Sequence, residues 1–259
     1  MKNLLFVVTV LISLALPKDI FGWGMTGHRV IGEIASKHLN KKTENHIKRV
    51  LGCNTLAQVS DYMDDIKSDR QERYDTLNAY HYVSIPDGMN YADANKNPKG
   101  DAIVGLRTAI NLLKTGNLSP EDEAFYLKIV IHIVGDLHQP LHIGRVDDKG
   151  GNTISVSWFG RKSNLHRVWD SDIIDGKLLS YTELTALIDH ATPKEVKELQ
   201  AATTDDWIQE AMDLRPTIYD FEEGRSWEYK YMYVNWEILQ NQLMKGGVRL
   251  AGILNDIYG

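Results

Sequence analysis

The chain has 259 residues, of which 43% are hydrophobic and 25% are charged, and it contains a single cysteine. This is the composition of an ordinary globular domain, and it excludes a disordered, collagen-like or disulfide-rich chain. The 29 Lys and Arg residues against 35 Asp and Glu give a formal charge of -6, which excludes a general basic surface for a long nucleic acid. Any binding of phosphate therefore needs a local source of positive charge.

The first 22 residues have the pattern of a secretory signal. Lys2 gives a positive start, Leu4–Leu16 is a mostly apolar run, and a short exit ends at the small residue Gly22. A membrane helix needs about 20 apolar residues, so we expect no membrane anchor. Cleavage after Gly22 makes Trp23 the new N-terminus, and we expect a secreted or periplasmic domain over residues 23–259.

Beyond the signal, the hydrophobic pattern is mainly helical. Apolar residues recur at steps of three and four, which is the period of an amphipathic helix. The repeats predict helices over 30–39, 56–66, 103–113, 120–134, 204–215 and 226–245. The segment 120–134 is apolar on almost every side, which predicts a buried central helix. We expect Gly246-Gly247 to end the helix over 226–245, with a short terminal helix after it.

One segment breaks the helical pattern. Gly150-Gly151-Asn152 precedes an alternating run, Thr153–Phe159, and Gly160 follows it. This pattern predicts a short β-hairpin near 152–162. Because the sequence contains no repeat or linker, we expect a mainly α fold: a single globular multi-helix domain with this one hairpin.

Histidines and aspartates carry the strongest chemical signal. His132 and Asp136 are four residues apart on the predicted central helix, which places them on one face, and His166 and Asp170 repeat the spacing. His142 lies two residues beyond a helix-ending proline. Imidazole and carboxylate are ligands of zinc, and a charged Asp136 on an apolar helix costs several kcal/mol unless a partner compensates it.

Each of these features also has a simpler interpretation. A single His-x-x-x-Asp pair is more often a hydrogen bond on a helix surface, and His132 alone fits a core histidine. Two such pairs together with His142 favour a metal site. His38, His46 and His190 lie in polar surroundings, and we expect them to face solvent.

These residues belong to a longer set of motifs that resembles a known family. The motifs cover the chain from 23 almost to its end, and the set resembles the S1/P1 family of zinc-dependent single-strand nucleases. They are Trp23-Gly24-x-x-Gly27-His28, Leu56-Ala57, Tyr62-Met63-Asp64, His81-Tyr82, His132-x-x-Gly135-Asp136-x-x-Gln139-Pro140-Leu141-His142, Gly150-Gly151-Asn152, Asn164-Leu165-His166-x-x-x-Asp170 and Lys245-Gly246-Gly247-x-Arg249-Leu250-Ala251.

The resemblance implies a mostly helical domain around a cleft that holds three Zn²⁺ ions. It implies that Asp136 bridges two of the ions, and that the terminal amine and carbonyl of Trp23 chelate one of them after removal of the signal. The implied ligand sets are Asp64, His81, His132 and Asp136 for one ion, Trp23, His28 and Asp136 for the second, and His142, His166 and Asp170 for the third.

The sequence departs from the family pattern at several positions. Tyr62-Met63-Asp64 replaces the usual Trp-Ala-Asp, and Asp61 and Asp65 compete with Asp64 as ligands. On a helix, Asp61 points away from the apolar stripe and Asp64 lies nearer to it, so we retain Asp64. Cys53 alone cannot form the two disulfides of the fungal members, which suggests a bacterial-type secreted enzyme.

The resemblance also implies the reaction and its residues. The expected activity is endonucleolytic hydrolysis of single-stranded DNA and RNA to 5′-phosphorylated products, together with 3′-nucleotidase activity on 3′-mononucleotides, by a monomeric enzyme. Asp64, Asp136 and Lys67 are the expected catalytic residues, and Tyr82, Lys67 and Asn152 are the expected substrate-binding residues. Ser84 stands where relatives often carry an acid near the base.

Other interpretations stay open at this point. Tyr82 fits a core residue and Lys67 fits a solvated surface lysine. A zinc-dependent phospholipase C that acts on phospholipid headgroups shares this kind of trinuclear site, and a non-enzymatic zinc-binding protein is a third alternative. Structural zinc usually has four protein ligands, whereas the set His142, His166 and Asp170 has three, which favours an open, catalytic position.

Overall fold

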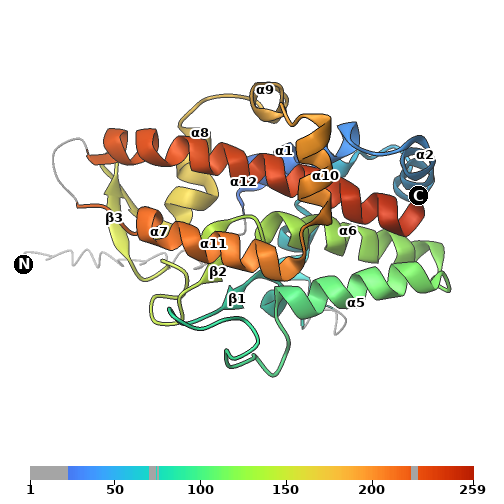
Figure 1. The fold of residues 1–259 in the computed structure, drawn as a ribbon, viewed down its shortest axis with the longest axis horizontal. Helices are drawn as coiled ribbons and strands as arrows, with labels where there is room; N and C mark the ends of the chain where they lie inside the picture. Colours follow the sequence, from blue (N-terminus) through green and yellow to red (C-terminus); the bar gives the residue numbers. More distant parts are fainter. Residues whose placement is uncertain (1–22, 70–73, 75, 223–226) are drawn as a thin grey trace, which may run out of the picture.

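The computed structural model describes residues 23–69, 74, 76–222 and 227–259 (Figure 1). The signal segment predicted over 1–22 lies outside the described residues. The described α-helices are α1 (Met25–Lys37), α2 (Lys41–Leu51), α3 (Leu56–Val59), α4 (Tyr62–Asp65), α5 (Ala102–Thr115), α6 (Pro120–Asp136), α7 (Leu165–Arg167), α8 (Ile173–Asp175), α9 (Tyr181–Ile188), α10 (Pro193–Ala201), α11 (Thr204–Ile218) and α12 (Trp227–Tyr258). The described strands are β1 (Val83–Ser84), β2 (Ile143–Gly144), β3 (Ser155–Trp158) and β4 (Arg161–Asn164).

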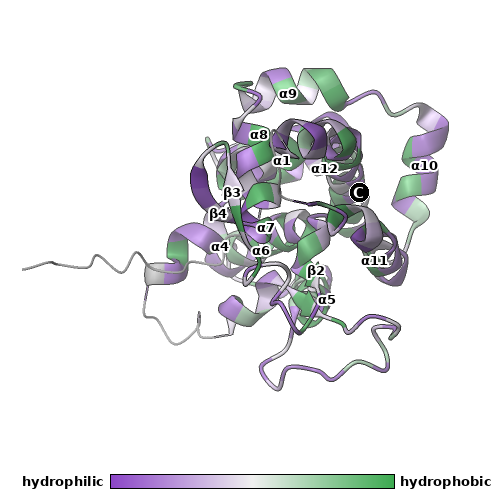
Figure 2. Cartoon of the chain, turned by 90° about the vertical axis from the view of Figure 1, so that its left-hand side faces the viewer, coloured by the Kyte–Doolittle hydropathy of each residue, from purple (hydrophilic) through white to green (hydrophobic). Residues whose placement is uncertain are grey.

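The prediction of a mainly α single domain is confirmed, because helices dominate and the described strands form only two short pairs. α5 packs along α6, and α1 packs along α12. α9 and α10 lie at the periphery, where hydrophobic and hydrophilic residues alternate around each helix (Figure 2). Within the described ranges, no helix is both long enough and apolar enough to cross a bilayer.

α6 is the buried central helix that the sequence predicts. It begins where Ser119 Oγ accepts a hydrogen bond from the amide of Asp122 at 3.1 Å, with Pro120 in its first turn. Every residue from Ile129 to Asp136 is buried. The polar side chains near the end of α6 therefore lie inside the apolar core, where each needs a partner.

The prediction that Gly246-Gly247 ends the last long helix is wrong, because α12 continues to Tyr258. A Cβ atom at Gly247 would lie 2.4 Å from Ile34 Cβ, and one at Gly246 would lie 3.2 Å from His138 Cγ. The glycines therefore let α12 pack closely against α1 and the end of α6. This packing offsets the cost of about 1 kcal/mol for each glycine within a helix.

The helical repeat over 56–66 is divided into two short helices, α3 and α4. α3 begins with a capping box between Thr55 and Gln58. At the break that follows, the carbonyl of Ser60 accepts a hydrogen bond of 2.7 Å from His132 Nδ1. The interruption thus provides a backbone partner for a buried histidine of α6.

The predicted hairpin is present as β3 and β4, which pair in antiparallel register. Its turn consists of Phe159 and Gly160, with φ angles of 46° and 75°, which suits a tight hairpin turn. The sequence did not predict the parallel pair of β1 and β2, in which Val83 pairs with Ile143. Because β1 follows His81 and β2 follows His142, this pair brings two candidate ligand segments side by side.

Candidate metal centre

Most of the predicted ligands meet in the interior, although they come from segments spread along the chain. They form three groups in which the ligand atoms lie within 4.8 Å of one another, and every member except Asp64 is buried. The groups are His28, His132 and Asp136; Asp64, His81 and His132; and His142, His166 and Asp170.

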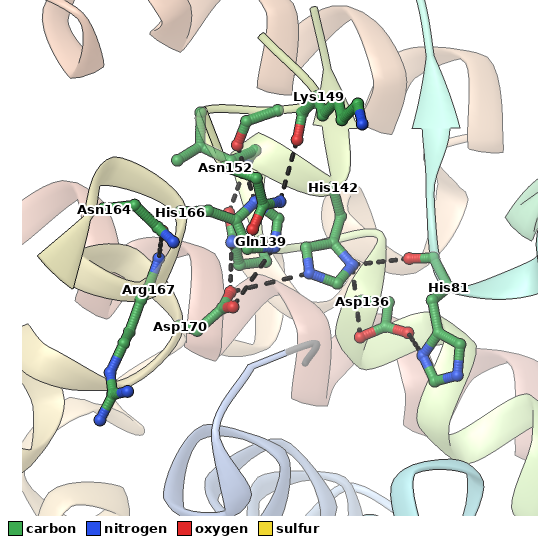
Figure 3. A network of polar contacts seen from close by, with 12 residues as sticks. His81, Asp136, Gln139, His142, Lys149, Asn152, Asn164, His166, Arg167 and Asp170 are labelled. Carbon is green, nitrogen blue, oxygen red and sulfur yellow. Dashed lines mark hydrogen bonds and ion pairs between the residues drawn. The ribbon is translucent and has the colours of Figure 1, made fainter. Parts of the chain in front are cut away.

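Asp136 lies at the junction of these groups. Its Oδ1 atom is 3.3 Å from His28 Nε2 and 3.5 Å from His142 Nδ1. Its Oδ2 atom is 2.9 Å from His81 Nδ1 and 3.3 Å from His132 Nε2. Figure 3 shows this carboxylate between His81 and His142. The two oxygens thus face different histidines, as a carboxylate must if it bridges two ions.

Asp64 contributes to the group on one side of Asp136. Its Oδ1 atom is 3.9 Å from His81 Nδ1 and 4.0 Å from His132 Nε2. The competing residue Asp61 is buried, but its Oδ2 atom lies 3.1 Å from Arg29 Nε. The structure therefore places Asp64 rather than Asp61 beside the histidines.

The third group surrounds Asp170. His166 Nε2 is 3.3 Å from Asp170 Oδ2, and His142 Nε2 is 3.7 Å from Asp170 Oδ1. The side-chain amide of Gln139 donates to Asp170 Oδ1 at 2.5 Å (Figure 3). Gln139 was part of the quoted motif, but its contact with Asp170 joins two distant segments and leaves no local signal in the sequence.

The segment that begins at Trp23 passes beside the backbone of Asp170. The side chain of Trp23 is buried, and the amide of the next residue, Gly24, donates to the carbonyl of Asp170 at 2.7 Å. His28 follows on α1 and packs over α6 where Gly135 has no side chain, since a Cβ there would lie 2.5 Å from His28 Nδ1. The absence of a side chain at Gly135 thus permits the packing of His28 on α6. The chelation of a metal ion by the terminal amine of Trp23 stays a prediction.

Hydrogen bonds to the main chain orient the histidine rings. In three rings Nδ1 donates to a backbone carbonyl, which fixes the tautomer and leaves Nε2 as the electron-pair donor. These bonds join His132 to Ser60 O at 2.7 Å, His142 to His81 O at 2.6 Å, and His166 to Gly150 O at 2.7 Å. Such anchoring of the second ring nitrogen is typical of histidine ligands to metals.

Electrostatic interactions keep the central carboxylate ionised. Burial alone would raise the pKa of Asp136, but His132 and His142 hold it well below its usual value. Burial would lower the pKa of His142, but Asp136 and Asp170 raise it to about 9. At His81 burial dominates and lowers the pKa to about 4. The pocket therefore favours positive charge beside Asp136.

Two unpartnered atoms at the centre test whether the residues fit a metal. Among the described residues, Asp136 Oδ1 and His28 Nε2 are buried and make no hydrogen bond, although they lie 3.3 Å apart. A buried polar group left in this state costs about 1 to 3 kcal/mol. A divalent cation held by imidazole nitrogens and carboxylate oxygens would satisfy both atoms, so the donor set fits zinc.

Among the predicted substrate-binding residues, Lys67 directly contacts a candidate ligand. Its Nζ atom is 2.6 Å from Asp64 Oδ1. Tyr82 is half-buried and lines a small cavity with Ser84 and Asp101. The side-chain amide of Asn152 donates to the carbonyl of Lys149 at 2.9 Å and closes the turn that carries Gly150 (Figure 3).

The remaining histidines lie outside the three groups. The prediction that His38 faces solvent is wrong, because it is half-buried and its Nε2 atom is 2.8 Å from Asp189 Oδ1. His46 is also only partly exposed and pairs with Glu123 at 2.7 Å. His190 is exposed, as predicted.

Comparison with known proteins gives matches over the whole described domain. The model of the family described as S1/P1 Nuclease matches residues 23–259. "Endonuclease 2" of Arabidopsis thaliana is 32% identical, over 98% of this chain and 97% of the relative. "Nuclease S1" of Aspergillus oryzae is 33% identical over 62% of this chain and 58% of the relative, and "Nuclease P1" of Penicillium citrinum is 23% identical over 92% and 98%.

Proposed function

The chain belongs to the S1/P1 nuclease family, and from this premise we propose that it is a zinc-dependent endonuclease that hydrolyses single-stranded DNA and RNA. We further propose that its products carry 5′-phosphates and that it also removes phosphate from 3′-mononucleotides. The observation that carries the proposal is the set of three His and Asp groups, buried except for Asp64, that meet at Asp136. The coarser statement, that the chain is a nuclease, follows from its relatives.

Three zinc ions are the proposed cofactors. Asp64, His81, His132 and Asp136 would hold one ion, Trp23, His28 and Asp136 a second, and His142, His166 and Asp170 the third. When bound, such ions supply a water-derived nucleophile near neutral pH and positive charge opposite the phosphate. They would also provide the local positive charge that a chain of formal charge -6 otherwise lacks.

The residues of this chain orient the reacting groups. Asp136 holds the groups on its two sides in a fixed relation, because each of its oxygens faces a different pair of histidines. Gln139 holds Asp170 through its side-chain amide. The proposed role of Lys67, whose Nζ atom pairs with Asp64, is to bind a non-bridging phosphate oxygen. These roles position a phosphodiester without a protein nucleophile.

The preference for single strands rests on Tyr82 and on the burial of the ligands. Tyr82 directly follows His81, and stacking of a base on such a ring contributes about 1 to 3 kcal/mol without regard to sequence. His81 and Asp170 are only 2% and 3% exposed. An unpaired nucleotide can enter a recessed centre of this kind, whereas the bases of a duplex are already paired and stacked.

Export and processing complete the proposal. The segment 1–22 is proposed to be removed as a signal, which would expose the amine of Trp23 close to Asp170 and His28. We propose a monomeric secreted or periplasmic enzyme. Under this proposal, processing and metal binding are coupled, because the internal peptide nitrogen of Trp23 is a far weaker ligand than a free amine.

The test compares matched substrates on the zinc-loaded protein. A single-stranded oligonucleotide, the same sequence as a duplex, and phosphatidylcholine vesicles are incubated with the enzyme, and the new ends are labelled. We expect cleavage of the single strand with 5′-phosphate ends, and loss of activity with excess chelator. Cleavage of lipid only would refute the nuclease proposal in favour of a phospholipase, and equal cleavage of the duplex would refute the strand preference.

A further inference from the structure

An ion network around the buried Arg249 lies beside the candidate metal centre and outside its three groups. Arg249 on α12 is only 2% exposed, and it binds both carboxylate oxygens of Glu210 on α11, at 2.7 Å and 3.0 Å. Lys245, one helical turn earlier, binds the same carboxylate at 2.9 Å. Two basic residues of the motif Lys245-Gly246-Gly247-x-Arg249 therefore converge on one acid.

The guanidinium of Arg249 also reaches a buried histidine. Arg249 Nη1 donates to His138 Nε2 at 3.1 Å, and His138 Nδ1 donates to the carbonyl of Val134 at 2.7 Å. Arginine is always a donor, so these two bonds fix the tautomer of the ring. The ring of Trp207 packs against the same imidazole at a centroid distance of 4.9 Å. His138 is thus held on several sides.

The position of His138 links this network to the metal centre. His138 follows Asp136 by two residues, and its ring satisfies a carbonyl in the last turn of α6. The next residue is Gln139, which binds Asp170, and His142 follows three residues later. The side-chain amide of Gln242 on α12 donates to the main-chain carbonyl of His138 at 3.4 Å. α12 therefore holds both the side chain and the backbone of residue 138.

The two glycines of the motif make this approach possible. A Cβ at Gly246 would lie 3.2 Å from His138 Cγ, and one at Gly247 would lie 2.4 Å from Ile34 Cβ. Larger residues would push α12 away and separate Arg249 from His138. Gly246 and Gly247 thus allow α12 to approach both His138 and α1 closely.

Burial of a guanidinium costs desolvation energy, and apolar residues of similar volume often give equal or greater stability. The contacts of Arg249 with Glu210 and His138 therefore favour a role in positioning rather than in stability alone. We propose that Arg249, fixed by Glu210, is a positioning residue that acts through His138 to hold the turn 136–142 in the arrangement that binds metal. This inference rests on the proposed zinc-dependent function.

The test measures zinc affinity rather than activity. Competition with a chromophoric chelator at 25 °C is carried out on the full processed chain and its variants Arg249→Met, His138→Leu and the double variant. Mutation of an outer partner of a metal ligand typically lowers metal affinity 10- to 100-fold. We expect each single variant to lose zinc affinity in this range, and the double variant to be no more than about threefold weaker than the weaker single variant.

Two further variants keep the test decisive. Leu254→Ala removes a fully buried side chain elsewhere on α12, so it destabilises the helix packing without touching His138, and its zinc affinity should stay within about twofold of the original. Glu210→Ala releases the same guanidinium from a partly exposed position. It replaces Arg249→Met if that variant does not fold, and the same loss is expected.

Three results would overturn the inference: unchanged zinc affinity in Arg249→Met, losses that multiply in the double variant, or an equal loss in Leu254→Ala. In each of them the unmodified chain still binds zinc, so the proposed function stands. Failure of the unmodified chain to bind zinc would instead refute the proposed function, and the inference with it.

Discussion

Replacement of Asp136 by Asn is expected to remove two metal ions and not one. Each oxygen of Asp136 faces a different pair of histidines, and an amide offers only one oxygen and no negative charge. With free zinc at 100 times the dissociation constant, each site contributes about 2.7 kcal/mol to the free energy of unfolding. Loss of two sites therefore costs about 5 kcal/mol, or about 10 to 20 °C in melting temperature for a domain of this size.

The assay measures zinc content by elemental analysis after gel filtration, and melting temperature at a fixed free zinc concentration. Asp189→Asn is the matched control, because Asp189 also pairs with a histidine, His38, at 2.8 Å but lies outside the three groups. The control should keep three ions and full nuclease activity. An Asp136→Asn protein that keeps three ions would refute the bridging role.

Three other predictions concern the terminus, the substrate and acid stability. A methionine retained ahead of Trp23 should leave the fold intact but remove one zinc ion and most of the activity, as measured by elemental analysis and nuclease assay; an equally active extended protein would contradict the chelate. Tyr82→Ala should raise KM for a single-stranded oligonucleotide about 5- to 150-fold with little change in kcat, matching a stacking contribution of about 1 to 3 kcal/mol. An unchanged KM would show that Tyr82 does not bind the base and serves only in packing. Burial alone would raise the pKa of Glu210, but Arg249 and Lys245 lower it from 4.5 to about 2. Its stabilising effect is therefore complete above pH 4.5 and is lost as the pH falls toward 2, at a cost of about 1 to 2 kcal/mol after allowance for solvent screening. In urea unfolding at pH 6 and pH 3, the loss of stability should be larger by about 1 kcal/mol in the original protein than in Glu210→Gln, which keeps the other acidic groups; equal losses would contradict this role of Glu210.

Local patterns predicted the helices whose packing follows a simple period. α6 is the clearest case, because an apolar surface on almost every side fits only a buried helix. The hairpin of β3 and β4 was predictable for a similar reason, since an alternating run before Gly160 fits strands and a tight turn. The sequence also carries start signals for α9 and α10, because Ser180 with Glu183, and Thr192 with Glu195, form capping boxes.

Features that depend on contacts between distant segments were not predictable from local patterns. Gly246-Gly247 reads as a helix end by propensity, and only close packing against Ile34 and His138 explains why α12 continues. The pairing of β1 with β2 involves two residues in each strand, which is too short to leave a period. The buried bonds from Gln139 to Asp170 and from Arg249 to His138 are likewise visible only in three dimensions.

For the candidate site, helical spacing identified the pairs His132 with Asp136 and His166 with Asp170, because each pair lies within one turn. Spacing alone does not place His28, Asp64 or His81 beside them, since these residues come from other segments. Their membership was implied by the family resemblance, and the structure brings them within 4.8 Å of the other ligand atoms of their groups.

The most direct test of the central claim is a crystal structure of the processed, zinc-loaded protein with anomalous diffraction data on both sides of the zinc absorption edge. The account predicts three anomalous peaks, two of them flanking Asp136 and the third between His142, His166 and Asp170. A map without peaks at these groups, from crystals of protein that cleaves single-stranded DNA, would contradict it.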